Sequence, residues 1–264
     1  MTTTAPSPAV TATATAAHDI WIRRFQPRPD ADVRLVCFPH AGGSALAYRP
    51  WAEAFDPSVE VLAVQYPGRQ DRYREPGVEN LGELADLVMP AVRAAVGGGR
   101  FALFGHSLGA ALAFEVARRL TGGHGPELLI ASGRRAPSQV RQEAYHRLDE
   151  RALAEHLQEL SGTDGRLLAD PDALQMILPA VRSDLRAIET YRCPPGTTID
   201  TPILALTGDR DPWTTLLEAA GWSAHTTRGF DLRVVHGEHF YLTEHQDEVL
   251  RLLAKRLRRV PELL

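Results

Sequence analysis

The sequence predicts an α/β protein built around a mostly parallel, doubly wound β-sheet, with a helical insertion late in the chain. Short apolar runs rich in β-branched residues recur between Gly and Pro residues, and amphipathic helical stretches separate them. Several runs are apolar throughout, as expected of parallel strands that helices cover on both faces. One interval between two strands is far longer than a crossover helix needs, which predicts the insertion.

The individual elements follow from these patterns. We expect an edge strand in 20–25 and core strands in 33–38, 59–66, 100–105, 128–133, 201–208 and 231–237. Apolar residues spaced three or four positions apart predict helices in 81–96, 110–120 and 246–259.

The long interval between the predicted strands 128–133 and 201–208 has a helical pattern of its own. Its two apolar stripes are Leu153, Leu157 and Leu160, followed by Leu174, Leu178, Val181, Leu185 and Ile188. We expect these helices to form a lid at about 136–198, and Pro179 to kink the second one. The alternative is a plain helical elaboration of the core.

Composition excludes several classes of protein. The chain has 264 residues, 44% of them hydrophobic, and a formal net charge of −4, which is typical of a globular protein and unlike a nucleic-acid binder or a polybasic membrane protein. Its two cysteines form neither a disulfide framework nor a structural zinc site. We expect no metal, no membrane span and a cytoplasmic location.

The first 17 residues differ in composition from the rest of the chain. Residues 1–17 contain mainly Thr, Ala, Ser and Pro and lack the features of a signal peptide, so we expect a disordered tail. The remainder, 18–264, is expected to form one domain that includes the lid insertion.

The segment Gly105–Gly109, with the sequence GHSLG, directly follows a predicted strand and precedes a predicted helix. This context is that of a nucleophile elbow, in which a serine sits on a strained turn and Cβ atoms at the glycines would collide. Ser107 is therefore the predicted nucleophile. The bare G-x-S-x-G pattern is weak evidence, and its position between strand and helix makes it strong.

A serine hydroxyl needs a base, and the base needs an acid that orients it. Two aspartates follow the predicted strand 201–208, in the sequence GDRDP. Asp211 is preferred as the acid because Asp209, immediately after the glycine, is well placed to close the turn by bonding backbone amides. Asp209 remains the alternative.

Two histidines lie in the loop after the last predicted strand. His239 is preferred as the base because Gly237 allows the chain to turn back over the sheet, and His236 remains the alternative. His40 and His106 are interpreted as structural residues.

Acyl transfer generates an oxyanion, so backbone N–H groups must point at it. Leu108, next to the nucleophile, is one predicted donor. Ala41, in the Gly-rich loop 38–44 after the first core strand, is the other. This loop lacks the glycine spacings of a nucleotide-binding loop.

The chain resembles the type II thioesterases that accompany polyketide synthases and nonribosomal peptide synthetases. The resemblance covers roughly residues 20–260. The motifs that carry it are FPHAGGSA (38–45), QYPGRQDR (65–72), FGHSLGA (104–110), ASGRRAPS (131–138), ETYRC (189–193), LTGDRDP (206–212) and GEHFYL (237–242).

The resemblance implies an α/β-hydrolase fold with a helical lid, a triad of Ser107, Asp211 and His239, and an oxyanion hole formed by Ala41 and Leu108. It also implies hydrolysis of acyl groups tethered through phosphopantetheine to acyl or peptidyl carrier proteins, which clears stalled or mis-primed chains. No cofactor is expected, since the phosphopantetheine arm belongs to the carrier. The chain is expected to be a monomer.

Other functions remain open at this point. They are a general carboxylesterase or lipase, a cyclising thioesterase, and a non-catalytic hydrolase-like scaffold, although the free-standing length favours water as the acyl acceptor. Five arginines are candidates for contact with an acidic carrier helix, but solvated surface charge is the preferred interpretation. They are Arg69, Arg72, Arg74, Arg134 and Arg135.

Overall fold

A computed structural model describes residues 20–120, 124–159 and 171–259 of the chain. Its seven-stranded sheet has the order β1-β3-β2-β4-β5-β6-β7, and every neighbouring pair is parallel except β1 with β3. The strands are β1 (Ile22–Arg23), β2 (Val33–Phe38), β3 (Val59–Val64), β4 (Phe101–His106), β5 (Leu129–Ser132), β6 (Ile203–Gly208) and β7 (Phe230–Val235).

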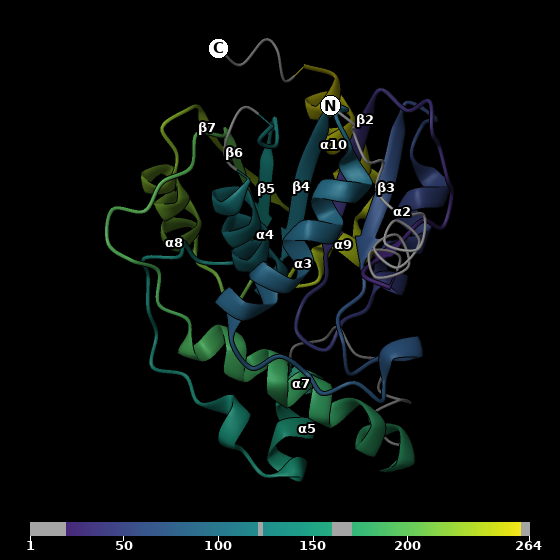
Figure 1. Ribbon diagram of the computed structural model, residues 1–264. Coiled ribbons are helices and arrows are strands. Elements are labelled where there is room, and N and C mark those ends of the chain that lie inside the picture. Colours follow the sequence, from purple (N-terminus) through teal and green to yellow (C-terminus); the bar gives the residue numbers. More distant parts are fainter. Residues whose placement is uncertain (1–19, 121–123, 160–170, 260–264) are drawn as a thin grey trace, which may run out of the picture.

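Helices cover both faces of this sheet (Figure 1). One face packs against α3 (Leu81–Val96) and α4 (Leu108–Arg119), and the other against α2 (Arg49–Ala54) and α10 (Gln246–Arg259). The shorter helices α8 (Leu216–Ala220) and α9 (Tyr241–Glu244) follow β6 and β7. The sheet thus lies between two apolar layers.

The burial of the strands explains why their sequences do not alternate. All six residues of β3, β4 and β6 are buried, since helices exclude water from both sides. The edge strand β7 differs, because most of its residues remain partly or fully exposed. The predicted α/β class and mostly parallel sheet are confirmed, and α3 and α10 have the predicted boundaries.

The insertion between β5 and β6 contributes α5 (Glu150–Glu159) and α7 (Pro171–Thr190), which lie together beyond one end of the sheet (Figure 1). A separate apolar cluster joins them through Leu153 and Leu157 of α5 and Leu178, Val181 and Leu185 of α7. Helix α7 is continuous through Pro179.

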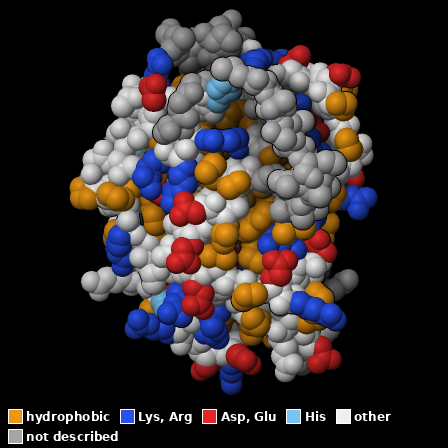
Figure 2. All heavy atoms as spheres, viewed as in Figure 1, with side chains coloured by type: hydrophobic (Ala, Val, Ile, Leu, Met, Phe, Trp, Pro, Cys, Tyr) orange, Lys and Arg blue, Asp and Glu red, His pale blue; other side chains and the backbone are white. Residues whose placement is uncertain are grey.

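Some predictions fall on other parts of the chain. Leu160 and the tail at 1–17 lie outside the described residues, so the tail and the single-domain division at 18–264 stay predictions. Among the described residues, no helix is both long and apolar enough to cross a membrane. Figure 2 shows acidic and basic side chains interspersed over one face of the molecule, without a large field of one sign.

Candidate active site

Ser107 lies at the turn between β4 and α4 in a strained backbone conformation. Its φ of 55° lies in the left-handed region that residues other than glycine rarely adopt. A Cβ atom at Gly105 would lie 2.0 Å from the carbonyl oxygen of Gly109, and one at Gly109 would lie 2.1 Å from that of Phe38. The two glycines are therefore required for the strand, the turn and the helix to approach one another, and the Ser107 N–H donates to the Ser132 carbonyl at 2.8 Å.

Asp211 and His239 meet at the carboxyl edge of the sheet. The Nδ1 atom of His239 lies 2.9 Å from Oδ2 of Asp211, and both residues are buried. The other carboxylate oxygen of Asp211 accepts the backbone N–H groups of Trp213 at 2.8 Å and Thr214 at 3.2 Å. These bonds fix the carboxylate, so that Nδ1–H of the neutral imidazole donates to it and Nε2 is left as the basic nitrogen.

The competing aspartate and histidine form a second pair at the surface. Oδ2 of Asp209 lies 2.9 Å from Nδ1 of His236, and their side chains are 43% and 60% exposed. The other oxygen of Asp209 accepts the Gly237 N–H at 2.9 Å. This backbone bond and His236 lower the pKa of Asp209. Asp209 thus links the loop after β6 to the loop after β7, and its backbone partner is Gly237 rather than an amide of its own turn.

A cavity of about 630 Å³, open to solvent, contains Ser107, Ala41 and His239 in its wall. Asp209 and His236 do not line it, whereas Thr214, next to the loop that holds Asp211, does. The structure therefore brings the preferred histidine and the serine to one cavity. Opposite them, α7 contributes Leu185, Ile188 and Glu189.

The loop after β2 is held by residues far away in the sequence. The Gly42 N–H donates to Oδ2 of Asp184 in α7 at 2.8 Å, and the Gly43 N–H donates to the His40 carbonyl at 2.9 Å. Ala41 precedes these two occupied donors and lines the cavity. Leu108, the first residue of α4, is fully buried. Ala41 thus shares a cavity wall with Ser107, and Leu108 is the residue that follows Ser107.

Three imidazoles gather around the serine. The rings of His106 and His239 are 4.9 Å apart, and those of His40 and His106 are 6.2 Å apart. Burial, together with the proximity of His239 and Arg69, lowers the pKa of His40 to about 4, and burial lowers that of His106 well below its usual value. His106 also contacts Ser132, with Nδ1 2.9 Å from Oγ. Its burial fits a structural role.

An aromatic wall closes the cavity on the side of the insertion, and the sequence did not reveal it. The Tyr145 and His156 rings are stacked at 3.8 Å, and Trp213 packs edge-on to His156 at 5.1 Å. All three line the cavity. The signal was weak because they come from three separate segments with no shared motif.

Three of the five arginines interpreted as surface charge are buried, which corrects that expectation. Arg69 pairs with Asp184, Arg72 with Glu75 and Arg135 with Glu143. In each pair the carboxylate offsets the cost of removing the guanidinium group from water. Of the other two, Arg74 is exposed and Arg134 is partly buried in the wall of the cavity.

The described residues contain no group of three or more His, Cys, Asp or Glu side chains placed to hold a metal ion.

A known protein family matches most of this chain. The thioesterase domain family matches residues 33–257. The chain is 51% identical to the thioesterase PikA5 of Streptomyces venezuelae, over 87% of this chain and 83% of that one. Its fold is similar to that of the type II thioesterase BorB from the borrelidin biosynthetic cluster, with a TM-score of 0.84, 48% identity, and coverage of 90% of this chain and 98% of that one.

The thioesterase RedJ from the prodiginine pathway of Streptomyces coelicolor is also similar, with a TM-score of 0.81, 37% identity, and coverage of 87% of this chain and 92% of that one. These relatives share the α/β-hydrolase architecture, which confirms the fold implied by the sequence motifs. The chain belongs to the thioesterase family, and its relatives include type II thioesterases of polyketide and nonribosomal peptide biosynthesis.

Proposed function

We propose that this thioesterase hydrolyses acyl groups from the phosphopantetheine arm of carrier proteins, through an acyl-enzyme on Ser107. The observation that carries the proposal is the buried Asp211–His239 pair, whose imidazole faces the same cavity as the strained serine. The exposed Asp209–His236 pair does not line this cavity.

The mechanism begins with proton transfer from the Ser107 hydroxyl to Nε2 of His239. The serine oxygen then attacks the thioester carbonyl, and the resulting imidazolium is stabilised by Asp211 through Nδ1. Because Trp213 and Thr214 hold the carboxylate by two backbone bonds, the imidazole keeps one orientation through the cycle.

The tetrahedral intermediate places a negative charge on the former carbonyl oxygen. The N–H groups of Ala41 and Leu108 are the proposed donors to that oxygen. Collapse of the intermediate expels the pantetheine sulfur, which leaves readily because a thiol has a pKa of about 8.5, and the thiolate takes the proton from the His239 imidazolium, so that Nε2 is basic again. Water activated by His239 then hydrolyses the acyl-Ser107 ester.

The partner follows from this substrate. A phosphopantetheine arm is carried by a carrier protein, so we propose a carrier protein in trans as the partner, together with a monomeric enzyme and a cytoplasmic location. The two-helix insertion is proposed to act as the lid of the cavity. The proposed biological role of this hydrolysis is to remove acyl groups that the synthase does not extend.

The test is release of acyl groups from loaded carrier protein. We expect Ser107→Ala to abolish release while leaving the melting temperature near that of the wild type. A matched control is Ser138→Ala, which removes a hydroxyl that contacts His225 outside the cavity. Undiminished turnover by Ser107→Ala, in protein free of wild-type enzyme, contradicts the mechanism.

A second measurement separates this function from that of a general esterase. Acyl-pantetheine thioesters and p-nitrophenyl esters of equal chain length are compared by kcat/KM. We expect the acyl-pantetheine thioester to be the better substrate, and a clear preference for the aryl ester contradicts the proposal.

A further inference from the structure

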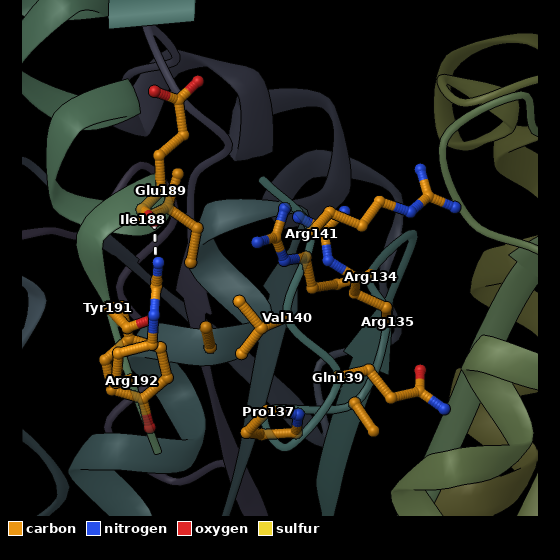
Figure 3. Close-up of a pocket in the computed structure, with 12 residues that line it drawn as sticks. Arg134, Arg135, Pro137, Gln139, Val140, Arg141, Ile188, Glu189, Tyr191 and Arg192 are labelled. Atoms are coloured by element: carbon orange, nitrogen blue, oxygen red, sulfur yellow. Dashed lines mark hydrogen bonds between the residues drawn. The ribbon is translucent and has the colours of Figure 1, made fainter. Parts of the chain in front are cut away.

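A second pocket adjoins the catalytic cavity between the segment that follows β5 and the end of α7 (Figure 3). Arg134, Arg135, Ile188 and Glu189 line both spaces, so these side chains form the partition between them. We call it the arginine pocket, because Arg134, Arg135, Arg141 and Arg192 line it.

The four guanidinium groups are not equally neutralised. Arg135 pairs with Glu143, and Arg141 pairs with Glu218. Within the described parts of the chain, Arg134 and Arg192 form no ion pair. The polar contacts of Arg192 are with the carbonyl oxygens of Glu189 and Tyr191, each at 2.7 Å.

Two further features show that hydrogen-bond donors are in excess here. Arg135 is 5% exposed, and its buried Nε has no hydrogen-bond partner in the described structure. Burial and the neighbouring Arg135 lower the pKa of Arg134 to about 9, so the folded protein bears a cost for holding this charge. A partly buried cation without an ion-pair partner and a buried N–H group without an acceptor are destabilising unless a ligand satisfies them.

The chemistry of the substrate matches this excess. A phosphopantetheine arm has one charged group, the phosphate, at the end opposite the thiol. The planar guanidinium group presents several N–H donors in a geometry suited to phosphate oxygens. The pocket also contains the Gln139 Oε1 atom, a buried acceptor without a partner in the described structure, which suits an amide N–H of the arm.

We propose that the arginine pocket binds the phosphate of the phosphopantetheine arm, with Arg134 and Arg192 as its principal ligands. The proposal rests on the proposed function for the identity of the substrate. With the thioester at Ser107, the arm passes the partition formed by Arg134 and Ile188 and ends in the pocket. The phosphate thereby supplies the acceptor that Arg134 and the Nε atom of Arg135 lack.

The experiment compares two small substrates that differ only in the phosphate, an acyl-phosphopantetheine and the corresponding acyl-pantetheine. We expect the wild type to have a KM about tenfold or more lower for the phosphorylated substrate, as charge-assisted hydrogen bonds permit. Arg134→Met should remove most of this preference, and Arg192→Met part of it. Arg74→Met is the control, since Arg74 is exposed and lies outside both pockets.

The ratio of the two KM values distinguishes binding from a structural effect. Equal KM values in the wild type overturn the proposal, and so does an equal loss on both substrates in Arg134→Met. If Arg134→Met slows only the reaction with carrier-bound substrate, the arginine contacts the carrier protein surface instead and the phosphate proposal fails.

A binding measurement tests the arginine pocket independently of the proposed function. Calorimetric titration of Ser107→Ala with phosphopantetheine and with pantetheine requires no turnover. We expect tighter binding of phosphopantetheine, and loss of the difference in the double variant with Arg134→Met. Such binding by a wild-type protein that hydrolyses no thioester would contradict the proposed function and support the pocket, whereas equal binding of both ligands overturns the pocket.

Discussion

Arg69 and Asp184 form a buried, two-point ion pair across 115 residues of sequence. Nη1 of Arg69 lies 2.6 Å from Oδ2 of Asp184, and Nη2 lies 2.9 Å from Oδ1. Arg69 also donates to the Gly43 carbonyl at 3.2 Å, and Asp184 accepts the Gly42 N–H. Helix α7 is thereby tied to the backbone of the loop that contains Ala41, the proposed oxyanion donor.

Breaking this pair should lower both stability and activity. Asp184→Asn preserves shape but leaves the Arg69 charge buried without its partner, so we expect the free energy of unfolding to fall by about 3 kcal/mol. We also expect kcat to fall because the loop that contains Ala41 loses a fixed acceptor. Urea denaturation and carrier-protein turnover measure the two effects.

The control is an exposed ion pair on the same helix. Arg186 of α7 pairs with Glu79, and both side chains are about half exposed. Glu79→Gln should change the free energy of unfolding by less than about 1 kcal/mol. Equal effects of Asp184→Asn and Glu79→Gln contradict the positioning role of the buried pair.

The two Asp–His pairs yield a direct comparison of catalytic importance. We expect Asp211→Asn to lower kcat by roughly 10³- to 10⁴-fold, since the neutral amide no longer holds the His239 tautomer that leaves Nε2 basic. Asp209→Asn, in the exposed pair, should change kcat by less than about threefold. Steady-state kinetics decide between them, and the reverse ranking assigns the catalytic acid to Asp209.

The elbow glycines provide a steric prediction. Gly105→Ala places a Cβ atom 2.0 Å from the Gly109 carbonyl oxygen, so we expect loss of several kcal/mol of stability or failure to fold. Gly98→Ala is the matched control, because a Cβ atom there meets nothing within 4 Å. Thermal melting of the two variants should therefore differ sharply, and similar melting temperatures would argue against the close packing at the turn.

Stability should decrease in mild acid because of the buried histidines. His40 and His106 have lowered pKa values, that of His40 being about 4 against an ordinary 6.5, so the folded chain stays neutral at these positions where the unfolded chain binds protons. The free energy of unfolding therefore falls as pH drops from about 6.5 towards 4.

Equilibrium denaturation at several pH values tests this. His40→Gln should flatten the dependence, whereas His124→Gln, at an exposed position, should leave it unchanged. A dependence as steep in His40→Gln as in the wild type removes His40 from the explanation.

The sequence by itself determined the features that rest on local patterns. The buried strands, the boundaries of α3 and the position of Ser107 between β4 and α4 follow from apolar runs, helical periodicity and flanking glycines. These patterns reflect interactions within one turn or one strand, so they can be recognised in the amino-acid sequence alone. The edge strand β1 is shorter than predicted, Ile22–Arg23 against 20–25, and β7 covers Phe230–Val235 against the predicted 231–237.

Only the tertiary structure decided which charged groups leave water. Asp209 and Asp211 stand two positions apart in one loop, yet one is exposed and the other is buried against His239. Arg69 was expected at the surface, and it is buried because Asp184 arrives from α7 to neutralise it. Burial of a charge depends on a partner brought from a distant segment, and no local pattern specifies that partner.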